Sequence, residues 1–129
     1  SIDFMKISDD GKRAYVLASR PAGDAKELVF GSFSLKRGAF ELIYVLKNVP
    51  EAAGFAFYKN HVVVLPRNPG PIDIFPLRKT RSTNVAPPEV PTEWTGSVLS
   101  FDMDLNYIAM LERMEGKTRV SSFPIKVKE

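Results

Sequence analysis

The stretch ISDDGKRAYVLAS, residues 7–19, has the pattern of a tight turn followed by a β-strand. Its acidic-glycine centre, residues 9–11, separates the apolar-rich residues 2–7 from the strand-like residues 12–19. A glycine in a hairpin turn supplies the positive φ angle that the twist of the two strands requires. We therefore predict that residues 9–11 form a turn rather than a ligand site.

The segment after this turn alternates with a period of two residues, which is typical of a strand. One face carries Ala14, Val16 and Ala18, and the other carries Tyr15 and Leu17. Because both faces are apolar, we expect the strand to be covered on both sides.

The same pattern recurs along the chain, and no segment has a sustained helical pattern. The best helix candidate, residues 110–116, is too short before Gly116 to be stable as a helix. β-branched and aromatic residues dominate six further strand-like segments, which are 27–35, 40–46, 54–58, 61–65, 97–101 and 107–111.

The strands fall into three groups with one scheme, a strand pair followed by a third strand with a shared ending. The strand pairs occupy residues 2–19, 53–67 and 96–113. The third strands end in Phe33-Ser34-Leu35-Lys36, Phe75-Pro76-Leu77-Arg78 and Phe123-Pro124-Ile125-Lys126. The three phenylalanines lie 42 and 48 residues apart, and the centres of the second strands, Val16, Val64 and Ala109, lie 48 and 45 residues apart. A shared period of this length is typical of propeller blades.

Residues 7–19 also resemble the S-x-DGK-x-x-YV hairpin of YVTN-type and related β-propeller repeats. In those families the Asp-Gly pair forms the tight turn between the first two strands of a blade, so the resemblance implies a propeller-like fold. It covers the first hairpin well, whereas the second and third groups match in strand pattern only.

We therefore expect an all-β fold of four-stranded antiparallel meanders, stacked as β-propeller-like blades within a single unit, residues 1–129. The expected repeats are about 1–48, 49–94 and 95–129, which amounts to about two and a half to three blades. The second repeat lacks a clear fourth strand, because Pro87, Pro88 and Pro91 cannot donate to a ladder. A β-barrel or β-sandwich built from the same hairpins is the alternative.

Composition limits the functional classes. The chain has 129 residues, 44% hydrophobic and 26% charged, which is typical of a soluble globular protein. Its net charge of +3 does not by itself indicate nucleic acid, although the pI of about 9.2 keeps such a partner open. The absence of cysteine excludes disulfides, thiolate metal sites and thiol catalysis.

Other features concern location and source. No apolar run approaches the ~20 residues of a membrane-spanning helix, and Asp3 and Lys6 interrupt the N-terminal apolar segment, so neither a span nor a signal peptide is expected. The chain begins with serine, which indicates processing or excision from a longer protein. The chain has ten prolines and no glutamine, an amino-acid composition that is typical of proteins from thermophilic organisms. The compartment stays open, with the cytoplasm favoured.

No catalytic or metal constellation is predicted, and no cofactor. His61 is the only histidine and has no cysteine to share a metal with. The run DMDLN, residues 102–106, begins like a calcium loop, but Tyr107 and Arg113 stand where that loop needs glycine and glutamate. We interpret residues 102–106 as a hairpin loop.

Basic residues follow each third strand and are the candidate binding residues. The densest cluster is Arg78, Lys79 and Arg81, and the corresponding residues are Lys36 and Arg37 in the first repeat and Lys126 and Lys128 in the third. If the repeats superpose, these residues form a basic rim that binds phosphate or an acidic partner. The alternative is that they only protect strand edges from pairing.

The proline-rich residues 86–91 predict a stiff, exposed loop. Trp94, just beyond it, is either an anchor for a partner or the residue that tucks this loop against the sheet.

Together these features predict a non-enzymatic binding scaffold that presents propeller rim loops to a protein or acidic partner. The alternative is the propeller portion of a larger enzyme, gating a hydrolase or binding a small molecule, with its chemistry outside this chain. Because propellers close with ~4–8 blades, we expect a homo-oligomer or blades supplied by another chain.

Overall fold

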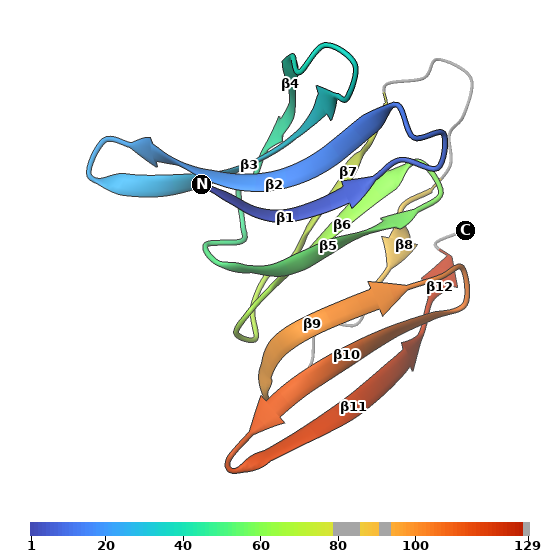
Figure 1. Ribbon diagram of the computed structural model, residues 1–129. Coiled ribbons are helices and arrows are strands. Elements are labelled where there is room, and N and C mark those ends of the chain that lie inside the picture. The colour runs from blue at the N-terminus through green and yellow to red at the C-terminus, as the bar shows by residue number, and fades with distance from the viewer. Residues whose placement is uncertain (79–85, 91–93, 128–129) are drawn as a thin grey trace. The chain divides into compact units, whose positions relative to one another are not determined.

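Every regular element in the computed structural model is a β-strand, which confirms the predicted all-β class (Figure 1). The structure describes residues 1–78, 86–90 and 94–127. The chain divides into two compact units, Ser1–Pro50 and Glu51–Glu129. This boundary lies beside the one expected between the first two repeats.

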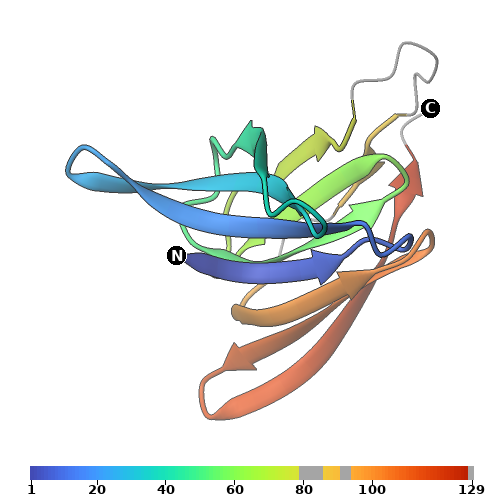
Figure 2. The same ribbon diagram turned by 45° about the horizontal axis from the view of Figure 1, so that its top comes forward.

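The first unit contains one four-stranded antiparallel sheet in the order β1-β2-β3-β4. Its strands are β1 (Ile2–Ile7), β2 (Arg13–Ala22), β3 (Ala25–Ser34) and β4 (Phe40–Val45). Residues 20–22 of β2 pair only with β3, so this hairpin projects beyond the other strands (Figure 2). Both faces of β2 are buried at its centre, as predicted, with Val16 on one face and Leu17 on the other.

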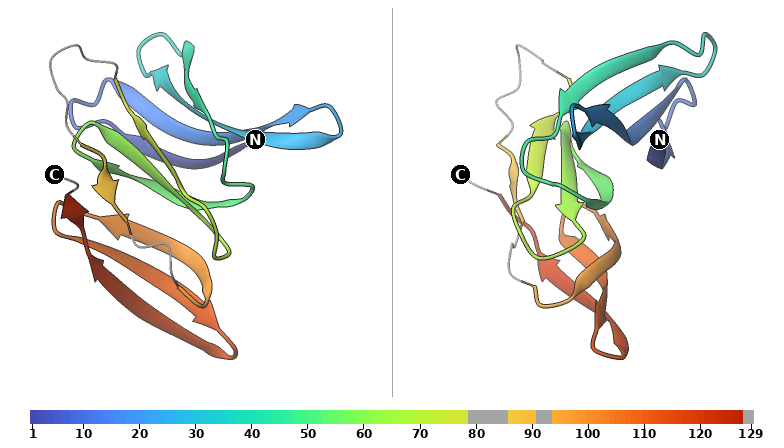
Figure 3. Two further views of the ribbon diagram at one scale, coloured as in Figure 1. Left: turned by 180° about the vertical axis from the view of Figure 1, so that it is seen from behind. Right: turned by 90° about the vertical axis from the view of Figure 1, so that its left-hand side faces the viewer.

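The second unit contains two three-stranded antiparallel sheets and a short strand pair. The first sheet consists of β5 (Ala52–Tyr58), β6 (His61–Pro66) and β7 (Asp73–Pro76), and the second of β9 (Ser97–Met103), β10 (Tyr107–Met114) and β11 (Lys117–Pro124). The short pair joins β8 (Pro88–Glu89) to β12 (Lys126–Val127), which lie side by side in Figure 3. Within the described residues no sheet closes into a barrel, so that alternative is not supported.

The core of the second unit lies between its two three-stranded sheets. Tyr58, Val63 and Leu65 from the first sheet pack in one cluster with Val98, Ile108 and Met110 from the second. Trp94 belongs to the same cluster and is only 7% exposed. The structure therefore places Trp94 in the core of the second unit.

The turn predicted at residues 9–11 joins β1 to β2. Gly11 has a φ of +71°, and its N–H donates to the Ser8 carbonyl at 2.9 Å. The Asp10 carboxylate accepts from the Ser8 hydroxyl at 2.6 Å and from the Lys12 N–H at 2.9 Å. The acidic side chain at the centre of the turn thus supports the turn itself.

The three meanders β1–β3, β5–β7 and β9–β11 share one pairing register. In each, a phenylalanine of the third strand pairs with the second residue of the second strand, and the pairs are Phe33–Ala14, Phe75–Val62 and Phe123–Ile108. Two residues later, a backbone N–H donates to the residue just before the second strand, from Leu35 to Lys12 at 3.0 Å, Leu77 to Asn60 at 2.7 Å and Ile125 to Asn106 at 2.8 Å.

This register corrects one detail of the sequence alignment. The residues two positions beyond the paired ones are Val16, Val64 and Met110, and all three are buried. Met110, and not Ala109, therefore corresponds to the centres of the other second strands.

Candidate functional site

Four basic residues gather where two turns of the first sheet meet. Lys12 and Arg13 lie at the end of the β1–β2 turn, and Lys36 and Arg37 lie in the turn between β3 and β4. The backbone hydrogen bond from Leu35 to the Lys12 carbonyl, 3.0 Å long, holds the two turns together. We call these four residues the turn-pair cluster.

The second turn has a defined conformation that presents Lys36 and Arg37 to solvent. Ser34 accepts twice, with its carbonyl from the Gly38 N–H at 2.7 Å and with its hydroxyl from the Arg37 N–H at 3.3 Å. Gly38 has a φ of +68°, which closes the turn. Lys36 and Arg37 are both exposed, so the turn fixes their backbone and leaves their charges free to contact a partner.

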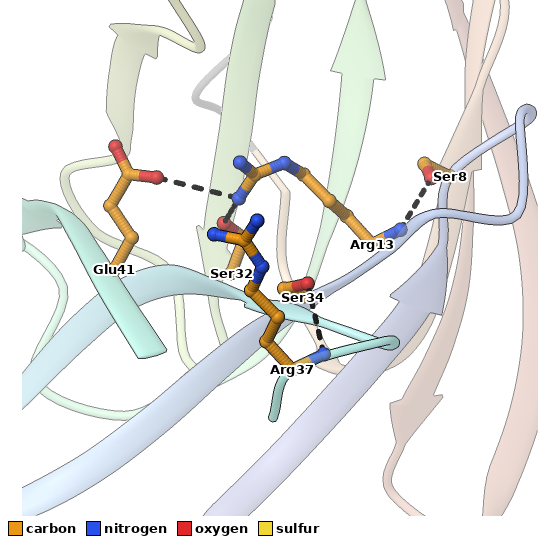
Figure 4. Close-up of polar contacts among 6 residues, drawn as sticks. All are labelled: Ser8, Arg13, Ser32, Ser34, Arg37 and Glu41. Carbon is orange, nitrogen blue, oxygen red and sulfur yellow. Dashed lines mark hydrogen bonds and ion pairs between the residues drawn. The ribbon is translucent and has the colours of Figure 1, made fainter. Parts of the chain in front are cut away.

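Arg13 is the most constrained member of the cluster (Figure 4). Its Nη1 donates to the Ser32 hydroxyl at 2.9 Å and forms an ion pair with Glu41 Oε2 at 3.4 Å. Its backbone N–H donates to the Ser8 hydroxyl at 3.1 Å. Ser32 is only 2% exposed, whereas 68% of the Glu41 side chain is exposed. The Arg13 guanidinium therefore has one buried partner, Ser32, and one solvent-exposed partner, Glu41.

The other three cationic groups of the cluster have no side-chain hydrogen bond or ion pair with any described residue. Several cations held at one sheet end, with Glu41 as the only carboxylate paired to them in the described chain, produce a positive local potential that favours anions.

Sequence reasoning identified Lys36 and Arg37 but missed Lys12 and Arg13. The signal was present, since Lys12 and Arg13 directly follow the predicted turn. In an antiparallel pair the start of β2 lies beside the end of β3, where Lys36 and Arg37 follow.

Register equivalence extends to the second unit. Lys36, Arg78 and Lys126 each lie three residues after the paired phenylalanine, and all three are exposed. The Arg78 carbonyl accepts from Asn60 Nδ2 at 2.7 Å, which holds the end of that meander. The other predicted binding residues, Lys79, Arg81 and Lys128, lie outside the described residues. A rim shared by all these residues stays a prediction.

The remaining sequence candidates are His61 and the loop of residues 102–106. Burial lowers the pKa of His61 below its ordinary value, because desolvation disfavours the charged imidazolium. The Asp104 carboxylate accepts from the N–H groups of Tyr107 at 2.8 Å and Asn106 at 2.7 Å, and these hydrogen bonds lower its pKa. Within the described residues no three metal-ligating side chains form a group.

Glu112 is a buried acid that sequence reasoning missed. It is fully buried in β10 on the face that also carries Ile108 and Met110. Its Oε2 accepts from the Gly96 N–H at 3.3 Å and lies 3.5 Å from Arg119 Nη2, while Oε1 has no hydrogen-bond partner among the described residues. The sequence feature that could have revealed it is the alternation of β10, in which Glu112 falls on the same side of the strand as the apolar residues Ile108 and Met110.

Comparison with protein-family models, curated proteins and solved structures returned no match. In the described part of the chain, no helix is long and apolar enough to cross a membrane. The functional argument therefore rests on the geometry of the basic residues.

Proposed function

We propose that this chain is a non-enzymatic binding scaffold whose strand-end turns bind an acidic protein partner. The observation that carries this proposal is the turn-pair cluster, in which four basic residues lie on two turns joined by a backbone hydrogen bond and three of their cationic groups have no partner among the described residues. The exposed basic residues at the equivalent positions of the second unit, Arg78 and Lys126, give it further support.

Edge protection accounts less well for the cluster. Lysines and arginines guard strands whose hydrogen-bonding edge is open. Lys36 and Arg37 lie in the turn between the central strand β3 and the edge strand β4, at the end of the sheet, and not within β4 itself, so they do not line its open edge. Edge protection stays an alternative for Arg78, because β7 has one pairing partner among the described strands.

A set of exposed charges suits recognition better than stability. A single exposed ion pair contributes about 0–1 kcal/mol, and salt screens it. Several like charges held on well-defined turns instead accelerate association with an oppositely charged partner and select for it. We therefore expect each basic residue of the cluster to contribute little by itself, and the total binding free energy to depend strongly on salt concentration.

The shared register of the three meanders supports the further proposal that they are blade-like repeats of a propeller. Each meander has the same pairing between its second and third strands. The alternative function, a propeller portion of a larger enzyme, has no specific observation in its favour and stays a prediction.

The test uses labelled poly-L-glutamate as the acidic probe, with binding followed by fluorescence anisotropy. The double variant Lys36→Glu/Arg37→Glu should weaken binding severalfold more than the control Lys26→Glu/Lys117→Glu, which changes the net charge equally at exposed positions of two hairpins. Binding should weaken as salt rises toward about 0.15 M. Equal effects of the two variants, or binding that is insensitive to salt, would contradict the proposal.

A further inference from the structure

Within the turn-pair cluster, Arg13 already binds a carboxylate, which belongs to Glu41 of the same chain. We propose that this pair marks the position at which a carboxylate of the acidic partner binds, and that Glu41 occupies Arg13 until the partner displaces it. This inference rests on the proposed function and names the residue and the chemical group involved.

The geometry of the pair favours exchange. Charge-assisted N–H···O bonds are typically about 2.7–2.9 Å long. The Arg13–Glu41 pair is longer, at 3.4 Å, and only one oxygen of Glu41 takes part. Glu41 lies on the edge strand β4 with most of its side chain in water. Exposed pairs of this kind are weak, so a partner with several carboxylates can replace the internal one.

The guanidinium itself stays in place when Glu41 leaves. Its Nη1 donates to Ser32, a buried residue of the central strand β3, and its backbone is held by Ser8. A guanidinium fixed in this way loses little freedom on binding, which reduces the entropic cost of the contact. The unpaired cations of Lys12, Lys36 and Arg37 are then available for further carboxylates of the same segment.

The chemistry on this face favours an acidic protein segment over a nucleic acid. Single-stranded nucleic acids bind through bases stacked on exposed aromatic rings as well as through their phosphates. The aromatic residue paired with Ser32 is Tyr15, which is buried and stacks on Phe30 with the ring centroids 6.1 Å apart. It offers no open ring face, and the group now on Arg13 is a carboxylate.

The first unit also contains a matched control. Arg20 and Glu27 form a second ion pair across β2 and β3, at the other end of the same strands. Glu27→Gln removes the same charge as Glu41→Gln and frees an arginine in the same way, but away from the turn-pair cluster. A difference between the two variants therefore measures the position and not the net charge.

The experiment measures binding of labelled poly-L-glutamate to four variants of the intact chain: Glu41→Gln, Glu27→Gln, Arg13→Gln and Arg13→Gln/Glu41→Gln. Glu41→Gln should tighten binding about two- to fivefold, the range expected for release of one exposed ion pair. Glu27→Gln should change it much less. In the Arg13→Gln background, the gain from Glu41→Gln should vanish. The comparison of Glu41→Gln with Glu27→Gln does not involve Arg13→Gln, so it stands even if Arg13→Gln fails to fold.

The outcomes separate this inference from the proposed function. If Lys36→Glu/Arg37→Glu weakens binding but Glu41→Gln behaves like Glu27→Gln, the function stands and the displacement of Glu41 is wrong. A gain from Glu41→Gln that persists without Arg13 also overturns the inference. If neither the wild-type chain nor Glu41→Gln binds the probe, both proposals fail. Tighter binding of oligothymidylate with the same number of charges would overturn the choice of an acidic protein segment.

Discussion

At the scale of single residues, the turn at residues 9–11 shows how local chemistry specifies a local conformation. Gly11 takes the left-handed backbone, and Asp10 accepts hydrogen bonds from both sides of the turn. Apart from Gly11 itself and its two chain neighbours, no residue has an atom within 4 Å of the position that a Cβ of Gly11 would occupy. The requirement for glycine is therefore purely a requirement of the backbone.

Replacing Gly11 tests this requirement. Gly11→Val should lower the free energy of unfolding by about 1–2 kcal/mol, because a β-branched residue is strained at positive φ. Gly11→Asn is the matched control and should cost less, since asparagine tolerates this conformation. Thermal or urea melts measure both. Equal stability of the wild type and Gly11→Val would refute the requirement.

His61 links stability to pH. Its pKa in the folded chain is lowered by desolvation, so the unfolded chain, with a histidine pKa of about 6.5, takes up the proton more readily. Unfolding then binds protons, and stability falls as the pH drops through about 6.5 toward the lower folded value. Between about pH 7.5 and pH 5.5, the wild type should lose more stability than His61→Gln. If urea melts showed that the wild type and His61→Gln lose the same stability over this pH range, His61 would make no contribution to the pH dependence of folding.

At the scale of elements, Glu112 ties the strands of the sheet β9–β11 together. It pairs across the sheet with Val98 of β9 and with Arg119 of β11. Its carboxylate is fully buried, whereas about half of the Arg119 side chain is exposed, 51%. A buried carboxylate needs its cation more than the half-exposed cation needs the carboxylate.

This asymmetry predicts a non-additive pair of substitutions. Arg119→Met should destabilise the chain by about 1–2 kcal/mol, less than for a fully buried pair because solvent partly screens the guanidinium. Glu112→Leu/Arg119→Met should recover much of the loss, since no unpaired charge stays buried. Urea melts of both single variants and the double variant complete the cycle. Additive losses would contradict this role of Glu112.

At the scale of the whole molecule, the apolar surface of the first sheet indicates association. Ile2, Met5 and Ile7 of the edge strand β1 are exposed. In the sheet register, Ile7 lies in one row with Phe40 and Met5 in one row with Leu42, and both of these β4 residues are exposed as well. Exposed apolar residues on one sheet face favour contact with another apolar surface.

We expect the pure chain to associate at micromolar concentration, either with a second copy or with blades from another chain when that chain is present. Met5→Glu/Leu42→Glu should shift it toward the monomer in sedimentation velocity. Val120→Glu, at an exposed position of β11, is the control and should not. A wild-type monomer that melts cooperatively would favour the sandwich interpretation over the propeller.

The sequence by itself determined the strands of the three meanders and β4, the turn at Gly11, and two of the four residues of the turn-pair cluster. It did not predict the short pair of β8 and β12. Strand periodicity and turn glycines depend on neighbours a few residues apart, so the hairpin around Gly11 and the basic Lys36 and Arg37 could be read directly. Only the tertiary structure decided the pairing of Arg13 with Glu41, 28 residues away, and the burial of Glu112 and Trp94. These features depend on the register between strands and on the packing of sheets, which join residues far apart in the sequence.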